Sequence, residues 1–306
     1  MPVPAIELKN LGKSYGSVQA LDGINLAVAP GEVFGFLGPN GAGKTTAIRI
    51  LFDLIRPTRG QALVLGFDAQ VEGVKARRLM GYVPGDLRLY DKLNGRQLVQ
   101  LFASFRQGEH DQNRLRELCH RLDIDLDHRI GTLSRGNKQK VGLLLALMHS
   151  PRVLVLDEPT SGLDPLVQEE VAKLVAEHAE AGNTVFFSSH VLSEVERMCH
   201  RVAFIRRGQL VAVEDVGQLK GRSLHVLEIT FGVEVPVEVW RIDGVRQLVS
   251  EGKSVRLEVR ANLDAVLDAV ASYPVVDLRT EQPSLEEIFI AYYHDDAPLA
   301  VAGGQP

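Results

Sequence analysis

A glycine-rich segment at residues 38–46, GPNGAGKTT, constrains the fold of this chain more than any other feature. It fits the pattern G-x-x-x-x-G-K-[ST], a loop whose backbone wraps around phosphate groups. The run before it, 32–37, is typical of a buried strand, and the run after it, 46–52, has the apolar spacing of a helix. Because this loop needs a strand, a glycine turn and a helix start, the sequence predicts an α/β fold here.

The loop is the first candidate site. We expect it to hold a nucleotide through Gly38, Pro39, Asn40, Gly41, Ala42, Gly43, Lys44, Thr45 and Thr46. Lys44 would reach the β- and γ-phosphates of ATP, and the Thr45 hydroxyl would ligate Mg²⁺. Exposed N–H groups and the helix start add positive potential toward the phosphates. The alternative is a glycine-rich turn with an incidental lysine.

Composition narrows the class of protein. The 306 residues suit about two domains of ~100–200 residues each. The net charge of −5 argues against a nucleic-acid partner, which favours basic domains. No apolar run approaches the ~20 residues of a membrane span, and the N-terminus has no secretory signal pattern. Cys119 and Cys199 lack metal-site spacing, so we expect reduced thiols in a cytoplasmic protein.

The pattern along the chain predicts a first domain at residues 1–220. Residues 1–30 alternate apolar and polar positions, which is typical of an antiparallel β subdomain. From residue 33 strands and helices alternate, which predicts a mixed, largely parallel core sheet. Residues from about 86 to 150 carry Leu, Arg and Gln at helical spacing, so we expect an inserted helical subdomain.

A second, smaller α+β domain is predicted at residues 221–294. Strand-like runs occur at 225–231 and 254–259. The final stretch, 295–306, is rich in Ala, Pro and Gly, and we expect it to be disordered.

Two helix starts are predicted in this smaller domain. Asn262 is placed to cap a helix that runs to about Ala271. Ser284 and Glu287 have the spacing of a capping box for a further helix.

Two carboxylates follow a predicted buried strand at residues 152–156. Asp157 and Glu158 come directly after this apolar run, at the strand end where open α/β sheets bind ligands. We expect Asp157 to hold Mg²⁺, and Glu158 to orient or deprotonate the attacking water. The alternative is a carboxylate pair that caps the next helix.

These segments, taken together, resemble the ATP-binding-cassette (ABC) ATPases. The resemblance covers roughly residues 5–220 and includes PTSGLDP at 159–165, LSRGNKQK at 133–140 and SSH at 188–190. It implies that the chain hydrolyses MgATP with the fold of an ABC cassette.

The resemblance also implies roles for two residues that would indicate no function by themselves. His190 is similar to the switch histidine that contacts the γ-phosphate, although a lone histidine is more often a surface or core residue. Tyr15 is similar to the aromatic residue that stacks on adenine, with Val18 beside it. The alternative for Tyr15 is core packing.

The resemblance implies that two copies of the chain face each other head to tail. Ser134 and Gly136 would then approach the γ-phosphate of the partner's ATP, and Asp164 would cross the interface and couple the two sites. A single copy would therefore hold only part of each site.

Two departures from the family pattern stand out. The signature reads LSRGN where LSGGQ is commonest, so Arg135 replaces Gly and Asn137 replaces Gln. Because Ser134 and Gly136 are kept, we expect this signature to work. Gly85 stands where the family has a glutamine that contacts Mg²⁺ and water, and our hypothesis is that Asp86 or a water takes its place.

The C-terminal segment 283–290, PSLEEIFI, resembles the tail of bacterial drug-exporter ATPases of the daunorubicin-resistance type. That resemblance implies a separate transmembrane permease, docked on the segment 87–105, which holds the chain at the inner face of the membrane. The alternatives are an importer, a lipid or polysaccharide exporter, and a soluble ABC ATPase of translation or DNA repair. The sequence does not name the cargo.

Overall fold

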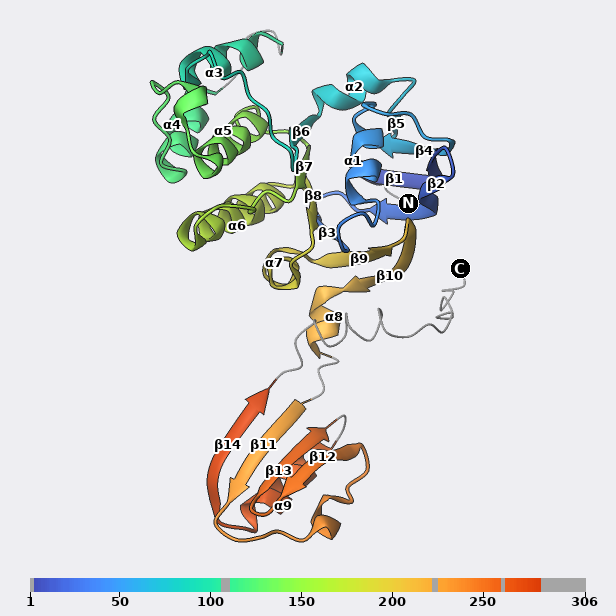
Figure 1. The fold of residues 1–306 in the computed structure, drawn as a ribbon, viewed down its shortest axis with the longest axis vertical. Coiled ribbons are helices and arrows are strands. Elements are labelled where there is room, and N and C mark those ends of the chain that lie inside the picture. The colour runs from blue at the N-terminus through green and yellow to red at the C-terminus, as the bar shows by residue number, and fades with distance from the viewer. Residues whose placement is uncertain (1–2, 106–110, 222–224, 260–261, 282–306) are drawn as a thin grey trace. The chain divides into compact units, whose positions relative to one another are not determined.

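The computed structural model describes residues 3–105, 111–221, 225–259 and 262–281 (Figure 1). The chain divides into two compact units between Asp215 and Val216. Helix α8 (Val216–Gly221) thus falls in the second unit, whereas the boundary predicted from the sequence follows residue 220. None of the helices in these ranges combines the length and the hydropathy of a membrane span.

The first unit is built on a six-stranded sheet in the order β10-β9-β3-β8-β7-β6. Its strands are β3 (Val33–Leu37), β6 (Met80–Val83), β7 (Val153–Asp157), β8 (Thr184–Ser189), β9 (Arg201–Arg206) and β10 (Gln209–Asp215). Neighbouring strands are parallel except β9 and β10. Every residue of β3, β7 and β8 is buried, as expected for strands covered on both faces. The predicted mixed core sheet is confirmed.

A second sheet in this unit is antiparallel, in the order β2-β1-β4-β5. Its strands are β1 (Ile6–Tyr15), β2 (Val18–Val28), β4 (Arg59–Val64) and β5 (Phe67–Asp68). Alternate apolar residues of β1 and β2 join one core with helix α1 (Lys44–Leu51) and the central sheet. The antiparallel pattern predicted for residues 1–30 is confirmed.

The described residues between β6 and β7 contain helices and no strand, and this is where the sequence predicts a helical insertion. They are α3 (Gly95–Ser104), α4 (Gln112–Arg121), η1 (Ile130–Thr132) and α5 (Arg135–Leu147), and Figure 1 shows α3, α4 and α5 grouped together. A capping box of Asn94 and Gln97 starts α3, and the Asp111 side chain caps α4.

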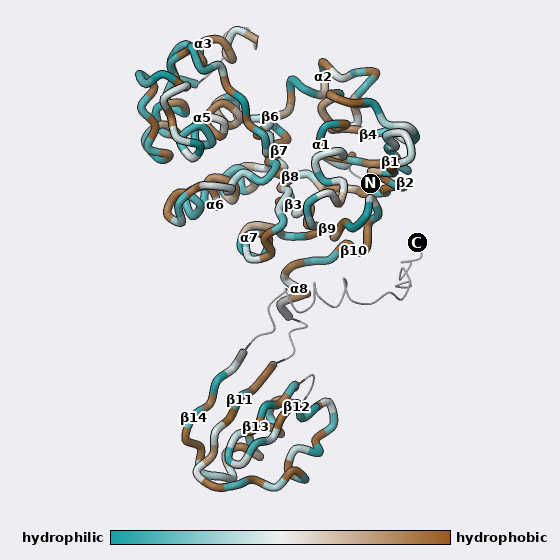
Figure 2. The backbone as a smooth tube through the Cα atoms, in the orientation of Figure 1, coloured by the Kyte–Doolittle hydropathy of each residue, from teal (hydrophilic) through white to brown (hydrophobic). Residues whose placement is uncertain are grey.

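The described part of the first unit has three further helices: α2 (Gly73–Arg78), α6 (Pro165–Glu180) and α7 (Leu192–Met198). The buried residues of α6 recur at helical spacing, from Val171 to Leu174, Val175 and His178. Hydrophobic and hydrophilic stretches therefore alternate along α6 in Figure 2.

The second unit contains an antiparallel sheet in the order β12-β13-β11-β14. Besides α8, the described elements of this unit are β11 (His225–Phe231), η2 (Val237–Trp240), β12 (Val245–Glu251), β13 (Ser254–Val259), α9 (Leu263–Ala271) and β14 (Val275–Glu281). Its core packs Val266 and Val270 of α9 and Trp240 of η2 against apolar residues of β11 and β13. The strands predicted at 225–231 and 254–259 are confirmed.

The helix predicted after Asn262 is also present, but the capping role of this side chain is wrong. Asn262 has a left-handed backbone (φ 58°) and makes no side-chain cap. Its amide instead donates to the carbonyl of Asp243 at 3.0 Å. A capping side chain needs an extended backbone at this position. The capping box of Ser284 and Glu287, the PSLEEIFI segment and the 295–306 tail lie outside the described residues.

Candidate active site

The predicted phosphate loop lies between the end of β3 and the start of α1. Gly43 has φ 112°, and a Cβ there would lie 2.6 Å from the carbonyl oxygen of Ala20. A Cβ on Gly38 would lie 2.4 Å from the carbonyl oxygen of Ile205. Both positions therefore need glycine. The loop encloses a cavity of 140 Å³, lined by Ala20, Pro39, Asn40, Gly41, Gly43, Lys44, Thr45, Thr46 and Glu158.

Lys44 lines this cavity and is itself buried. Its Nζ donates to the carbonyl oxygens of Gly38, at 2.5 Å, and Pro39, at 3.2 Å. It also lies 3.6 Å from Oε1 of Glu158. Burial lowers the pKa of Lys44, and the negative charges of Glu158 and Asp157 oppose that shift. The ammonium group is thus held inside the loop that would wrap the phosphates.

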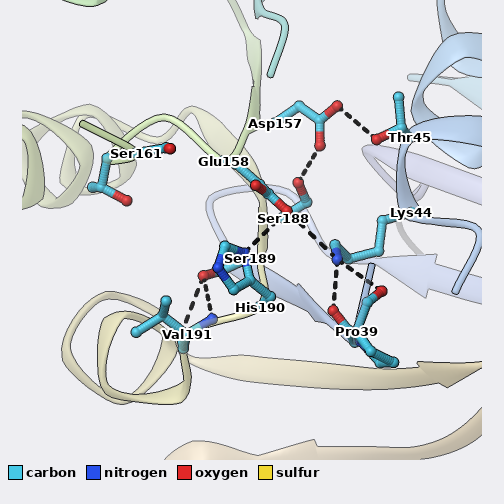
Figure 3. A network of polar contacts seen from close by, with 12 residues as sticks. Pro39, Lys44, Thr45, Asp157, Glu158, Ser161, Ser188, Ser189, His190 and Val191 are labelled. Carbon is cyan, nitrogen blue, oxygen red and sulfur yellow. Dashed lines mark hydrogen bonds and ion pairs between the residues drawn. The ribbon is translucent and has the colours of Figure 1, made fainter. Parts of the chain in front are cut away.

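Asp157 is the buried last residue of β7. Its Oδ2 accepts a hydrogen bond from Thr45 Oγ1 at 3.0 Å, and its Oδ1 accepts one from Ser188 Oγ at 2.5 Å. Thr45 comes from α1 and Ser188 from β8, so three elements meet at this carboxylate (Figure 3). A hydroxyl and a carboxylate are hard oxygen ligands, and they fit Mg²⁺, which takes few protein ligands and completes its shell with phosphate and water.

Glu158 follows Asp157 and has a left-handed backbone, with φ 51°. Non-glycine residues in this conformation cost roughly 1–2 kcal/mol, and such strain gathers at functional sites. Its Oε1 lies 3.1 Å from Nδ1 of His190, which directly follows β8. Figure 3 shows Lys44, Glu158 and His190 pointing toward one another. The structure therefore brings the predicted acid, lysine and histidine together at one edge of the sheet.

A layer of supporting contacts was not predicted from the sequence. Glu194 of α7 accepts hydrogen bonds from Ser189 Oγ, at 2.6 Å, and from Thr160 Oγ1. Thr160 lies two residues after Glu158, so α7 connects the two strand ends that carry the acid and the histidine. No local pattern in the sequence signals that Glu194 takes part, because its partners come from two other segments.

Tyr15 and Val18 lie opposite each other where β1 turns into β2. Both are exposed, at 48% and 64%, so core packing of Tyr15 is excluded. The ammonium group of Lys13 lies 4.9 Å from the centre of the Tyr15 ring. Ala20 of the same strand β2 lines the phosphate-loop cavity, so this strand leads from the loop toward the tyrosine.

Ser134, Gly136 and Asp164 do not line the phosphate-loop cavity of their own chain. Ser134 caps α5 and accepts from the backbone N–H of Asn137 at 3.2 Å. Asp164 caps α6 and accepts from the N–H of Val167 at 3.0 Å. The structure thus splits the predicted site residues into a group around the loop and a separate group at two helix starts.

Gly85 lies beside Asp157. A Cβ on Gly85 would stand 3.3 Å from the carbonyl oxygen of Asp157 and 3.6 Å from its Oδ2. A side chain at this position would therefore contact the predicted Mg²⁺ ligand. Asp86 is exposed and its carboxylate pairs with Arg88 at 3.0 Å, so the hypothesis that Asp86 replaces the missing glutamine gains no support from its contacts.

Known proteins similar to this chain are described as ATP-binding proteins of transport or drug resistance. The family model described as "ABC transporter" matches residues 21–161. An uncharacterized ABC transporter ATP-binding protein of Bacillus subtilis, YhcH, is 32% identical over 295 residues, covering 93% of this chain and 94% of the relative. The daunorubicin resistance ATP-binding protein DrrA3 of Streptomyces coeruleorubidus is 32% identical, covering 95% and 96%. The bacitracin transport ATP-binding protein BcrA of Bacillus licheniformis is 37% identical, covering 73% and 74%.

Solved structures agree with these relatives. The dimeric structure of a bacterial ABC transporter cassette matches with a TM-score of 0.64 and 27% identity, covering 69% of this chain and 98% of the cassette. The same cassette in a post-hydrolysis state bound to ADP and Pi matches with a TM-score of 0.62 and 26% identity.

Proposed function

The chain belongs to the ABC transporter ATPase family, and from that membership we propose that it is the ATP-hydrolysing subunit of a bacterial exporter. As a member of this family it binds ATP and is an ATP hydrolase. The observation that carries the ATP-hydrolysing role is that Lys44, Asp157, Glu158 and His190 lie together beside one glycine loop.

We propose a role for each side chain of this site and for the N–H groups of the loop. Lys44 and the loop N–H groups bind the β- and γ-phosphates. Thr45 and Asp157 would hold Mg²⁺, which when bound offsets negative charge on the phosphates. Glu158 orients the attacking water and accepts its proton, and His190 contacts the γ-phosphate while its Nδ1 faces the Glu158 carboxylate.

We propose that two copies complete two sites, head to tail. Ser134, Gly136 and Asp164 lie outside the loop cavity of their own chain, and Ser134 and Asp164 are exposed. An exposed helix start with free N–H groups suits the γ-phosphate of a partner's ATP. The similarity to a cassette solved as a dimer supports the arrangement.

The membrane part of the exporter is proposed to be a separate permease, which holds this subunit at the inner face of the membrane. Drug- and bacitracin-type names among the relatives support export, and the helical region 87–105 is the proposed docking segment. We propose that residues 221–294 form an accessory domain of this subunit. Cargo choice then belongs to the permease.

The test is light scattering after size-exclusion chromatography on the Glu158→Gln protein, with MgATP, with MgADP and without nucleotide. The chain of 33.6 kDa should double in mass only with MgATP, because the variant binds ATP but turns it over slowly. A variant that stays monomeric with MgATP would contradict the head-to-tail arrangement.

A further inference from the structure

The start of α5 is fastened to the loop that follows the catalytic carboxylates of its own chain. Nη2 of Arg135 donates to Ser161 Oγ at 3.3 Å, and Nε2 of Gln139 donates to the carbonyl oxygen of Pro159 at 3.1 Å. Residues four apart share one helix face, so both contacts come from the same side of α5. A Cβ on Gly136 would lie 2.9 Å from the carbonyl oxygen of Gly162, so the backbones also meet there.

The loop receiving these contacts is short and internally hydrogen-bonded. The N–H of Ser161 donates to the carbonyl of Glu158 at 3.3 Å, and the N–H of Leu163 donates to the carbonyl of Thr160 at 3.1 Å. Asp164, at its end, starts α6. Ser161 is thus joined through backbone hydrogen bonds and a short stretch of chain to Glu158 on one side and to Asp164 on the other.

Arg135 is not needed for the stability of its own helix. It is the first residue of α5, where a positive charge is opposed by the helix dipole at a cost of about 0.3–1 kcal/mol. Its side chain is exposed, so the single hydrogen bond to Ser161 adds little to folding. The glycine that is commonest at this position in the family has no side chain to make the contact. A residue that breaks a local rule in this way points to a functional role.

We propose that Arg135 is a positioning residue that links the signature helix to residues 158–164 of its own chain. When Ser134 and Gly136 engage the partner's ATP, the link carries that engagement to this chain's Glu158 and Asp164. This inference rests on the proposed dimer for its consequence. The link itself is a property of the single chain.

The first experiment tests the link in the single chain without nucleotide. Hydrogen–deuterium exchange is compared between the full-length protein and Arg135→Met, which keeps the length of the side chain but cannot donate. Amides of residues 160–163 should exchange at least about threefold faster in the variant, while those of β7 keep their rate. Arg129→Met, which removes another exposed arginine before α5, should change neither segment. Equal exchange at 160–163 in Arg135→Met would overturn the link.

The second experiment tests its consequence by a double-mutant cycle for MgATP-driven dimerisation in the Glu158→Gln background. Arg135→Met and Ser161→Ala should each raise the dimer dissociation constant about fivefold. The double variant should also raise it only about fivefold, because both substitutions remove the same interaction. Arg135→Lys should recover part of the loss, and ATP affinity of the monomer should stay the same in all variants. A dissociation constant raised about 25-fold in the double variant would mean that the two effects multiply. Arg135 would then act on the partner independently of Ser161, which overturns the proposal.

The two experiments separate the inference from the proposed function. If the Glu158→Gln background itself fails to dimerise, the proposed dimer fails, while exchange at residues 160–163 still decides whether Arg135 positions the loop.

Discussion

Oε1 of Glu158 lies 3.1 Å from Nδ1 of His190, and the same oxygen lies 3.6 Å from Nζ of Lys44. The three residues follow β7, β8 and β3, which are neighbours in the central sheet. Because parallel strands end at the same edge, three distant segments deliver their side chains to one point. Glu158, the predicted base, thus lies beside the lysine expected to bind the phosphates and the histidine expected to contact the γ-phosphate.

Replacing Glu158 by Gln should slow ATP turnover at least ~10²-fold, because a positioned general base contributes that much to the rate. ATP binding should persist, since Lys44 and the loop are untouched. Single-turnover hydrolysis with radiolabelled ATP measures the first effect and equilibrium binding the second. The same substitution at the exposed Glu180 is the control. Turnover within a few-fold of the parent would remove Glu158 from the role of base.

Replacing Lys44 by Ala should weaken ATP binding roughly 10- to 100-fold, because a hydrogen bond between charged groups is lost from a buried site. Isothermal titration calorimetry with MgATP measures the change. Lys75→Ala is the matched control, since Lys75 is an exposed lysine paired with Glu72. If nucleotide affinity is the same in both variants, the phosphate-loop assignment is wrong.

The glycine loop allows a matched pair of substitutions. Gly43→Ala places a Cβ 2.6 Å from the carbonyl oxygen of Ala20, while Gly41→Ala, at φ 80°, meets nothing within 4 Å. Both variants carry the backbone strain of about 1–2 kcal/mol, and only Gly43→Ala adds a clash worth about 1–3 kcal/mol more. Urea unfolding should therefore rank Gly43→Ala below Gly41→Ala. Equal stabilities would mean that the loop relaxes freely around Gly43.

Much of the site could be predicted from the sequence, because its motifs have fixed local geometry. The glycine loop needs β3 before it and α1 after it, and Asp157 and Glu158 need a strand that ends at them. The contacts of Glu194 with Ser189 and Thr160 could not be predicted, since they depend on how α7 packs against two strand ends. The same holds for Asn262, whose side chain turns to Asp243 in a neighbouring loop and leaves the helix start uncapped.

The contact of Arg135 with Ser161 lies between these cases. The sequence marks Arg135 as a departure from the commonest form of the signature, but its partner belongs to a segment that meets α5 only in the folded chain. Local sequence motifs thus identify the candidate site residues, whereas tertiary packing determines which of these residues contact one another.

Acid should destabilise the first unit through His178, a buried residue of α6. Burial lowers the pKa of His178 to about 4 from the usual 6.5, so the folded state resists a proton that the unfolded chain accepts. Below pH 6.5 the unfolded state binds more protons, so the free energy of unfolding falls as the pH drops, until both states are protonated below pH 4. Between pH 7 and pH 5 this group alone should remove about 2 kcal/mol.

Urea unfolding at pH 7 and pH 5 measures this loss. His178→Asn, which takes up no proton in this range, should be less stable than the parent at pH 7 but should lose about 2 kcal/mol less on going to pH 5. An unchanged pH dependence in His178→Asn would show that the acid sensitivity of this unit resides in other groups.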